Sequence, residues 1–202
     1  MKLQLKTDFL DYYDHWFDVQ GQLFERISTS GMNRLQMLDF LSERQVQTVP
    51  YGYVHEFRGH SSFEELVVYT NPMSHRGEGK VKLTVKEACD KYPDNLCSLF
   101  LSENQKAVSY RHLQIGEIFV WLKYESLTDW RSNNGDVEIE IIDYFYERPY
   151  AIDIPLFAID FIMFKEKLYS MDFNIAPQIK GTGIETLIKS KEIVELIKNS
   201  LA

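Results

Sequence analysis

The stretch FAIDFIMFKEKLYSMDFNIAPQIKGTGIE, residues 157–185, contains two apolar segments separated by the charged tripeptide KEK. This pattern predicts two antiparallel strands joined by a tight turn. Residues two apart on a strand point to the same face, so Asp172 and Asn174 present their oxygen atoms together. Asp160 lies on the preceding strand and, in an antiparallel pair, across from them. Three oxygen donors are therefore expected to converge near the end of the second strand.

Two carboxylates and an amide oxygen are the hard ligands that Mg²⁺ prefers, and Mg²⁺ usually bridges such ligands to substrate phosphates. The stretch thus predicts a magnesium site formed by Asp160, Asp172 and Asn174. An equally simple explanation is that Asp160 is an isolated carboxylate at a sheet edge and that Asp172 and Asn174 form a turn. The stretch alone leaves both explanations open.

The composition of the 202-residue chain indicates a globular protein with one large domain or two small ones, since 45% of the residues are hydrophobic and 14% are aromatic. The net charge of −8 argues against a general nucleic-acid-binding protein, but it allows one nucleotide in a local basic pocket.

The two cysteines, Cys89 and Cys97, form neither a CxxC motif nor a Cys/His cluster, so neither a zinc site nor a disulfide framework is expected. No apolar run reaches the roughly 18 residues of a membrane helix, and the N-terminal sequence is too acidic and aromatic for a signal peptide. The sequence therefore predicts a soluble cytoplasmic protein without membrane contact.

Hydrophobic periodicity and turn residues predict an α+β chain without a regular strand–helix–strand alternation. Thr84 and Glu87 have the spacing of a capping box, which marks the start of one helix. Residues 142–150, which include Pro149, are expected to form a helix or a loop. Helices are expected at residues 8–18, 33–45, 84–92 and 190–201. Strands are expected at residues 66–70, 96–101, 106–115, 117–126, 136–142, 155–164 and 167–175.

The segment VVYTNPMSHRGEGKVKL, residues 67–83, predicts a strand, a loop and a returning strand. Gly77 and Gly79 permit a tight backbone whose amide groups can approach a phosphate, and Arg76 and Lys80 add positive charge. A solvated, charged hairpin turn is the simpler explanation of this segment taken alone.

The segment ESLTDWRSNNGD, residues 125–136, places Arg131 between an aromatic residue and a run of small polar residues. An arginine in this setting can clamp a phosphoryl or carboxylate group through two parallel hydrogen bonds. The alternative is a surface loop whose arginine is paired with a neighbouring carboxylate.

Taken together and in this order, the segments resemble the ATP-grasp enzymes, most closely the ligases that add glutamate to ribosomal proteins or cofactors. The resemblance covers about residues 32–198. AIDFI followed by MDFNIAPQIKGTGIE carries it most specifically, with the spacing of twelve residues and then two between Asp160, Asp172 and Asn174. The other similar segments are GMNRLQMLDFLSERQVQTVPYG, ELVVYTNPMSHRGEGKVKL, LCSLFLSE, SYRHLQIGEIFVWLKYE and DWRSNNGD.

This resemblance implies an ATP-grasp fold, in which two α+β subdomains enclose a nucleotide. The expected boundaries are residues 32–104 for the nucleotide-covering subdomain and 105–202 for the metal and catalytic subdomain. Residues 1–31 would form an aromatic helical segment where the family usually has a further domain, and this segment would contact a second copy of the chain or a partner chain. The implied reaction uses ATP and Mg²⁺ to activate a small-molecule or peptide carboxylate as an acyl phosphate, which an amine then attacks.

The resemblance also implies roles for individual residues. The implied catalytic residues are Arg131, Lys123 and Arg111. The implied metal ligands are Asp160, Asp172 and Asn174. The implied nucleotide contacts are Arg34, Arg76, Gly77, Gly79, Lys80, Leu99, Phe100, Leu101 and Glu103.

The sequence departs from the family pattern at several of these positions. Tyr69 stands where the family usually has a phosphate-binding lysine, and Lys123 or Arg111 is expected to supply the displaced charge. Arg34 stands where a lysine is common, and Asp172 replaces the commoner glutamate. These departures leave two alternatives to a ligase: an inactive nucleotide-binding module that acts as a regulatory or structural partner, and an unrelated α+β protein.

Overall fold

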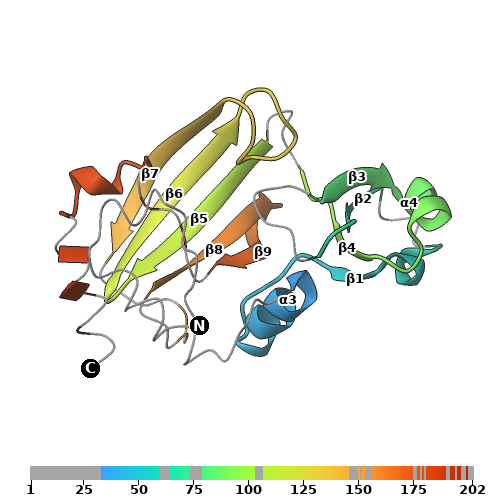
Figure 1. The fold of residues 1–202 in the computed structure, drawn as a ribbon, viewed down its shortest axis with the longest axis horizontal. Helices are drawn as coiled ribbons and strands as arrows, with labels where there is room; N and C mark the ends of the chain where they lie inside the picture. The colour runs from blue at the N-terminus through green and yellow to red at the C-terminus, as the bar shows by residue number, and fades with distance from the viewer. Residues whose placement is uncertain are drawn as a thin grey trace.

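The computed structural model of the 202-residue chain describes residues 33–59, 64–72, 79–102, 107–145, 150, 152, 156–174, 177, 179, 181–189, 192–193, 195–196 and 199. Two antiparallel sheets lie side by side, a larger one and a smaller one, with a helix near their junction (Figure 1). The predicted helix at residues 8–18 lies outside the described residues, as does most of the predicted helix at 190–201. None of the helices among the described residues is long and apolar enough to cross a membrane.

The small sheet has the strand order β1-β4-β2-β3, and all of its pairs are antiparallel. A short helix, α4 (Val85–Lys91), and a 3-10 helix, η1 (Val54–Phe57), lie at the end of this sheet remote from the large sheet (Figure 1). The predicted capping box of α4 is present, because Thr84 Oγ1 accepts from the Glu87 amide at 3.2 Å and Glu87 accepts from the Thr84 amide at 3.1 Å. The strands are β1 (Tyr51–Tyr53), β2 (Glu65–Tyr69), β3 (Lys80–Thr84) and β4 (Leu96–Leu99).

The large sheet has the strand order β7-β6-β5-β8-β9, again with antiparallel pairs only. The predicted hairpin of β8 and β9 is confirmed, and Lys165 and Glu166 form its turn with φ angles of 50° and 60°. Such left-handed values at both turn residues match the twist of the flanking strands. The strands are β5 (Ala107–Ile115), β6 (Ile118–Ser126), β7 (Val137–Phe145), β8 (Leu156–Phe164) and β9 (Lys167–Asn174).

The prediction of a helix or loop from residue 142 onward is wrong as far as Phe145, because β7 continues to that residue. The strand passes a register shift opposite Trp121 and Leu122, and Phe145 then pairs with Phe119 on β6. This β-bulge interrupts the alternation of side chains between the two faces of β7, so the periodicity of residues 142–145 does not predict a strand. The strand is formed there by backbone pairing with β6. Residues 146–149 lie outside the described part of the chain.

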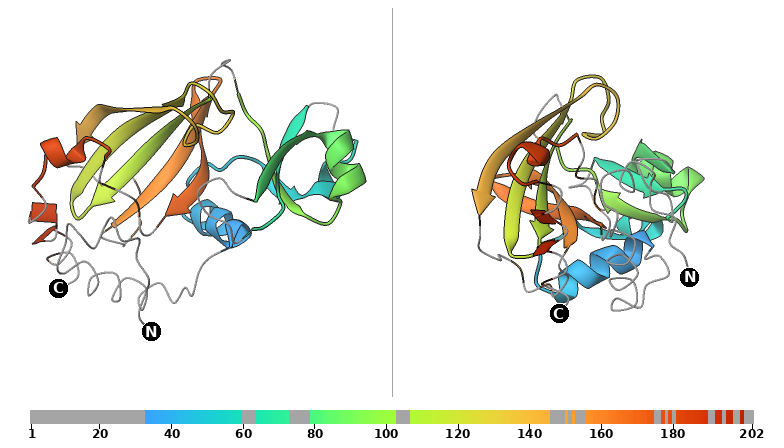
Figure 2. Two further views of the ribbon diagram at one scale, coloured as in Figure 1. Left: turned by 45° about the horizontal axis from the view of Figure 1, so that its top comes forward. Right: turned by 60° about the vertical axis from the view of Figure 1, so that its left-hand side comes forward.

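The helix α3 (Arg34–Glu43) joins the two sheets (Figure 2). Its N-cap Asn33 and Gln36 form a capping box with two bonds of 2.9 Å. Met37 and Leu41 pack into the core of the large sheet, whereas Leu38 packs into the core of the small sheet. The helix therefore belongs to both cores, which fixes the position of its first residue between the sheets.

The chain after α3 adds a direct link between the sheets. The Val49 amide donates to the Ser170 carbonyl at 2.9 Å, and the Ser170 amide donates to the Gln47 carbonyl at 2.7 Å. Residues 47–49 thus pair with β9 of the large sheet immediately before β1 of the small sheet begins. These backbone bonds hold β9 at a fixed distance from the small sheet.

A fully buried histidine lies inside the large sheet. His112 is stacked between Phe119 and Trp121, with ring centroids 4.8 Å and 4.3 Å away, and Tyr150 meets it edge-on at 5.4 Å. Within the described part of the chain neither ring nitrogen has a hydrogen-bond partner. Burial lowers the pKa of His112 to about 3, so the folded protein holds it as a neutral aromatic ring.

This burial predicts an acid-sensitive stability. Unfolded His112 gains a proton below its ordinary pKa of about 6.5, while the folded form stays neutral until about pH 3. Stability from this group is therefore complete above pH 6.5 and falls by about 1.4 kcal/mol per pH unit below it. Between pH 7.5 and pH 5, urea denaturation should show a loss of about 2 kcal/mol that His112→Phe abolishes. An unchanged acid-dependent loss in His112→Phe, or its removal by the exposed-site control His55→Gln, would contradict this assignment.

Candidate functional site

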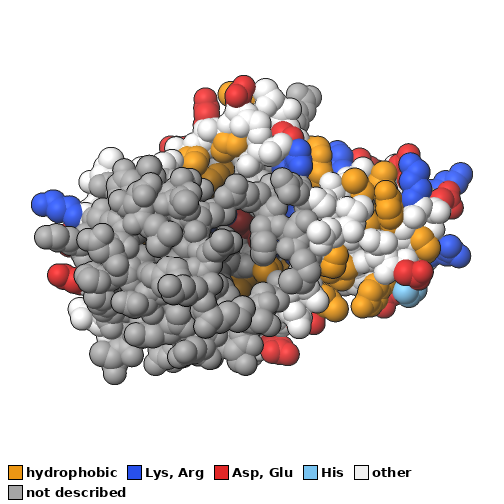
Figure 3. All heavy atoms as spheres, in the orientation of Figure 1, with side chains coloured by type: hydrophobic (Ala, Val, Ile, Leu, Met, Phe, Trp, Pro, Cys, Tyr) orange, Lys and Arg blue, Asp and Glu red, His pale blue; other side chains and the backbone are white. Residues whose placement is uncertain are grey.

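A cleft with a volume of about 150 Å³ lies between the two sheets. In the space-filling view of Figure 3 a hollow opens between the two parts of the molecule. Both sheets and the loop between β6 and β7 supply its walls. The lining from the small sheet and the connection after it comprises Val67, Tyr69, Lys80 and residues 98–102. The lining from the large sheet and its loop comprises residues 107–108, Tyr110, 130–133, Asp160, Ile162, Met163, Met171 and Asp172.

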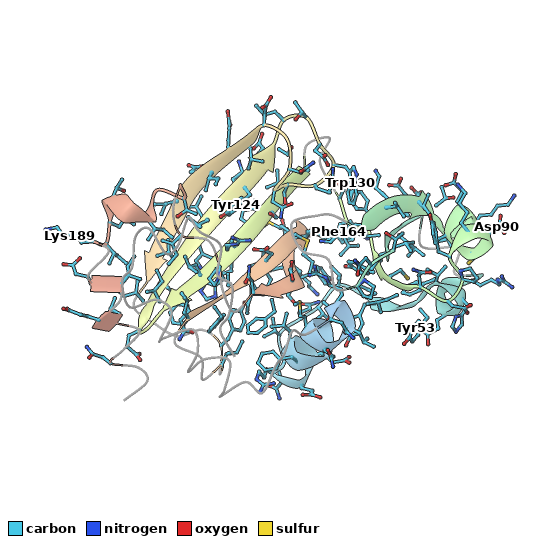
Figure 4. All side chains as sticks on the ribbon, in the orientation of Figure 1. Tyr53, Asp90, Tyr124, Trp130, Phe164 and Lys189 are labelled. Carbon is cyan, nitrogen blue, oxygen red and sulfur yellow. The ribbon has the colours of Figure 1, made fainter. Side chains whose placement is uncertain are left out.

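Part of the cleft lining is apolar, and this part is called the apolar chamber below. Leu99, Phe100 and Leu101 line it from the small-sheet side, and Met163 and Met171 line it from β8 and β9. The Phe100 ring meets the Trp130 ring edge-on, with centroids 6.0 Å apart, and Trp130 is labelled in Figure 4. Flexible thioethers and aromatic faces can enclose a flat, weakly polar ring. Residues 99–101 are among the predicted nucleotide contacts, whereas Trp130 lines the cleft without being one of the predicted site residues.

The two carboxylates of the opening stretch also line the cleft, in a part called the charged end below. Asp160 on β8 lies directly opposite Asp172 on β9, and both line the cleft. Asn174 is paired in register with Ala158 and is outside the set of described residues that line the cleft. The structure thus brings together two of the three predicted oxygen donors at the cleft wall, and Asn174 follows further along the same strand.

Each of these carboxylates has an arginine partner. Arg111 lies directly opposite Asp160 on β5 and donates to both of its oxygens, from Nε at 2.7 Å and from Nη2 at 2.9 Å. Arg34, the first residue of α3, forms an ion pair with Asp172. Three strands and one helix therefore hold the row Arg111, Asp160, Asp172, Arg34, in which two cations flank two anions. The sequence indicated all four residues but not this pairing.

Lys80, on β3, faces the same row from the small sheet. Its burial, followed by the nearby charge of Arg34, lowers its pKa to about 8, although Asp172 and Asp160 act in the opposite direction. Lys80 has no ion-pair partner among the described residues, and it lines the cleft. A partly buried cation in this position can bind an anion that enters the cleft.

The Tyr69 ring lies close to both of these cations. Its ring centroid lies 5.4 Å from the Arg34 guanidinium and 5.8 Å from Lys80 Nζ, and its hydroxyl bonds to Ser98 Oγ at 2.9 Å. An aromatic face attracts both cations, whereas a lysine at this position would add a third positive charge beside them. Ser98 is a cleft residue that the sequence did not predict, and the single serine within the apolar run LCSLFL is the signal that could have indicated it.

Arg131 lines the cleft and is also paired within its own loop. Its Nε and Nη2 donate to the two oxygens of Asp129 at 2.9 Å and 2.7 Å. The Arg131 guanidinium and an Asn134 bond hold the pKa of the Asp129 carboxyl well below its usual range. Both alternatives drawn from the sequence therefore describe part of its position, since the arginine is ion-paired and also reaches the cleft.

The remaining predicted residues have different positions. Lys123 on β6 donates to Glu125 at 2.9 Å and is outside the described lining of the cleft, so the structure does not bring it to the other candidates. Gly79 has a φ of 61°, and its carbonyl accepts from the Thr70 amide at 2.9 Å, which closes the base of the loop. The other predicted nucleotide contacts lie outside the described residues, namely Arg76, Gly77 and Glu103.

No protein-family model matches the sequence, and no curated protein matches it. Solved structures do match. D-alanine–D-alanine ligase from Bacillus anthracis, complexed with ATP, has a TM-score of 0.54 and 10% identity, over 84% of this chain and 65% of that one. The ATP-grasp ligase PsnB, complexed with minimal precursor, Mg and ADP, has a TM-score of 0.55 and 11% identity, over 92% of this chain and 60% of that one.

The chain therefore has the ATP-grasp fold, as the resemblance of its segments implied. It spans 65% and 60% of the length of these two structures. At such identities the likeness establishes the arrangement of helices and strands, and the chemistry has to be argued from the residues of this chain.

The charges around the cleft predict the titration of Lys80. A side-chain NMR titration should give Lys80 a midpoint near pH 8. Arg34→Met removes a neighbouring positive charge and frees Asp172, so the midpoint should rise toward the ordinary value of 10.5. Arg44→Met is the matched control, because this exposed arginine lies at the other end of α3. The same midpoint in Arg34→Met and in the unsubstituted protein would show that Arg34 does not act on Lys80.

Proposed function

We propose that this chain binds ATP in the cleft between its two sheets and is an ATP-dependent ligase. In this proposal a carboxylate substrate is activated as an acyl phosphate and then attacked by an amine. The observation that carries the proposal is that an apolar chamber adjoins a charged cluster within a single cleft of an ATP-grasp fold. A nucleotide has the same two halves, a flat base and a polyanion.

The base is assigned to the apolar chamber. Phe100, Met163 and Met171 offer it apolar contacts, and the backbone of residues 99–101 follows the last strand of the small sheet along the chamber wall. Glu103, two residues after this segment, remains a predicted nucleotide contact. A mostly apolar wall with few polar groups is the usual setting for a bound heterocycle.

The phosphates are assigned to the charged end. Lys80 supplies a cation that has no ion-pair partner among the described residues, and Arg131 lies on the opposite wall. Gly79 closes a loop whose residues Arg76 and Gly77 are the further predicted phosphate contacts. Phosphoryl transfer depends mainly on positioning and charge neutralisation, which these groups can provide.

Magnesium is assigned to the carboxylate pair, with Asn174 as the predicted third ligand. Asp160 and Asp172 fit this role, since they are hard oxygen donors that face each other at the cleft wall. Among the described residues no group of three or more histidine, cysteine, aspartate or glutamate side chains is placed to hold a metal ion. In this proposal nucleotide phosphates and water complete the coordination. When bound, the ion would neutralise phosphate charge during transfer.

The proposed reaction has two steps. A substrate carboxylate oxygen attacks the γ-phosphorus of ATP, the bond from phosphorus to the ADP oxygen breaks, and an acyl phosphate forms. The amine nitrogen then attacks the acyl carbon, inorganic phosphate leaves, and the nitrogen loses a proton. Arg131 would orient the phosphoryl or carboxylate group from the loop, while Arg111 would act through Asp160, which it holds in place.

A second candidate is a nucleotide-binding module without ligase activity. Two observations favour it: both carboxylates are already paired with arginines, and Tyr69 occupies the position of the usual lysine. In that case the chain would act as a regulatory or structural partner, with residues 1–31 as the expected contact to another chain. Nucleotide binding is common to both candidates, and only turnover separates them.

The proposal predicts that ATP with Mg²⁺ stabilises the protein. At a nucleotide concentration of 100 times Kd the free energy of unfolding should rise by about 2.7 kcal/mol, which corresponds to roughly 5–10 °C in Tm. Lys80→Met should weaken nucleotide binding at least about tenfold in isothermal titration calorimetry, since a charge-assisted contact contributes about 1.5–3 kcal/mol. Lys86→Met is the matched control, because Lys86 is exposed on α4 and remote from the cleft.

Absence of any Tm shift with millimolar ATP and Mg²⁺ would overturn the proposal. Equal losses of affinity in Lys80→Met and Lys86→Met would overturn the phosphate assignment. ADP formation that requires both a carboxylate and an amine, tested with mixtures of amino acids and peptides, would identify a ligase. Nucleotide binding without such ADP formation would identify the inactive module.

A further inference from the structure

We propose that Arg34 and Arg111 are permanent counterions of the carboxylate pair and that they make metal binding dependent on the nucleotide. A divalent ion would then enter the cleft together with a polyphosphate and not by itself. This inference rests on the proposed function for the identity of the polyphosphate, but its first step concerns the protein and the metal alone.

Asp160 and Asp172 are directly opposite each other on neighbouring strands. Like charges in this position repel, and their partial burial strengthens the repulsion. Either a cation from outside or cations of the protein must compensate it, and here Arg111 and Arg34 provide one positive charge for each carboxylate.

The two arginines lie behind the carboxylates as seen from the cleft. Asp160 and Asp172 line the cleft, whereas neither arginine belongs to its described lining. The side chains of Arg34 and Arg111 are only 3% and 11% exposed. A ligand in the cleft can therefore meet the carboxylates without contacting the guanidinium groups that neutralise them.

Further contacts hold each guanidinium group in place. Arg111 also donates to the Tyr124 hydroxyl at 3.4 Å and lies 4.9 Å from the centre of its ring, and Tyr124 is labelled in Figure 4. Arg34 donates to the Met171 carbonyl at 3.4 Å and faces the Tyr69 ring. Both cations thus have partners besides the carboxylates, so they stay in position when a carboxylate takes another ligand.

The net charge of this cluster determines how readily a divalent cation binds without a polyphosphate. Arg34, Arg111 and protonated Lys80 carry three positive charges, and Asp160 and Asp172 carry two negative ones, which leaves one positive charge. A lone divalent cation would enter a cluster that is already positive, and it would compete with two guanidinium groups for the same oxygens. A polyphosphate reverses this balance, because it brings the negative charge that the cluster lacks.

The test measures Mn²⁺ binding from the loss of the free-ion EPR signal. After subtraction of the Mn²⁺ that the analogue binds in the absence of protein, the full chain should bind Mn²⁺ at least about tenfold more tightly with a non-hydrolysable ATP analogue than without it. Without nucleotide, Arg111→Met should bind Mn²⁺ at least about tenfold more tightly than the unsubstituted chain, because Asp160 loses its counterion while the new side chain keeps similar bulk. Arg34→Met should have the same effect through Asp172. A tenfold change corresponds to about 1.4 kcal/mol.

Two matched controls separate charge from other effects of substitution. Arg111→Lys keeps the positive charge and should not gain Mn²⁺ affinity. Arg44→Met removes an exposed arginine that directly follows α3, remote from the cleft, and should behave like the unsubstituted chain. Circular dichroism identifies any variant that fails to fold. The comparison of Mn²⁺ binding with and without analogue uses the unsubstituted chain and does not depend on the folding of a variant.

Equal Mn²⁺ affinity of the unsubstituted chain with and without bound analogue would overturn the inference. Folded arginine-to-methionine variants that gain no affinity for Mn²⁺ would overturn it as well. If the analogue does not bind at all, the proposed function fails, while the gain in the methionine variants still supports the arginines as counterions. Failure of the inference and failure of the proposed function are therefore distinguishable.

Discussion

The cleft depends on one electrostatic constraint. Two opposed carboxylates, Asp160 and Asp172, are paired with Arg111 and Arg34 in a partly buried wall of the cleft. Buried charges are tolerated only when they are paired and hydrogen-bonded, and breaking one such pair typically costs several kcal/mol. Arg111 satisfies both oxygens of Asp160, and Arg34 compensates Asp172. The row can form only if β5, β8, β9 and α3 are all in place, so the site depends on the fold.

The position of α3 connects this constraint to the two sheets. Its side chains enter both hydrophobic cores, and its first residue reaches β9. The backbone bonds between residues 47–49 and β9 add a second connection beside it. The apolar chamber and the charged end therefore lie at fixed places in one cleft. That arrangement suits a ligand with an apolar ring at one end and several negative charges at the other.

The hairpin of β8 and β9 could be predicted from the sequence, but the exact pairing of its aspartates could not. Its two-residue turn sets a register in which Asp160 would face Met171, and a register shift between Asp160 and Phe161 places Asp160 opposite Asp172. The partners of the aspartates could not be predicted either, since Arg111 is 49 residues from Asp160 and its position depends on the pairing of β5 with β8. Lys123 was expected at the site, but its position on β6 leads it to Glu125 instead. The end of β7 was missed because a bulge interrupts its alternation. For Arg111 and for the end of β7 the deciding contact is distant in sequence.

The most direct test of the nucleotide cleft is a crystal structure of the protein with a non-hydrolysable ATP analogue and Mn²⁺, located by its anomalous scattering. The expected result is a base against Phe100 and Met171, phosphates beside Lys80, and an anomalous peak next to Asp160 and Asp172, with both arginines still paired. Analogue density outside the cleft, or a metal peak remote from the two aspartates, would contradict the account.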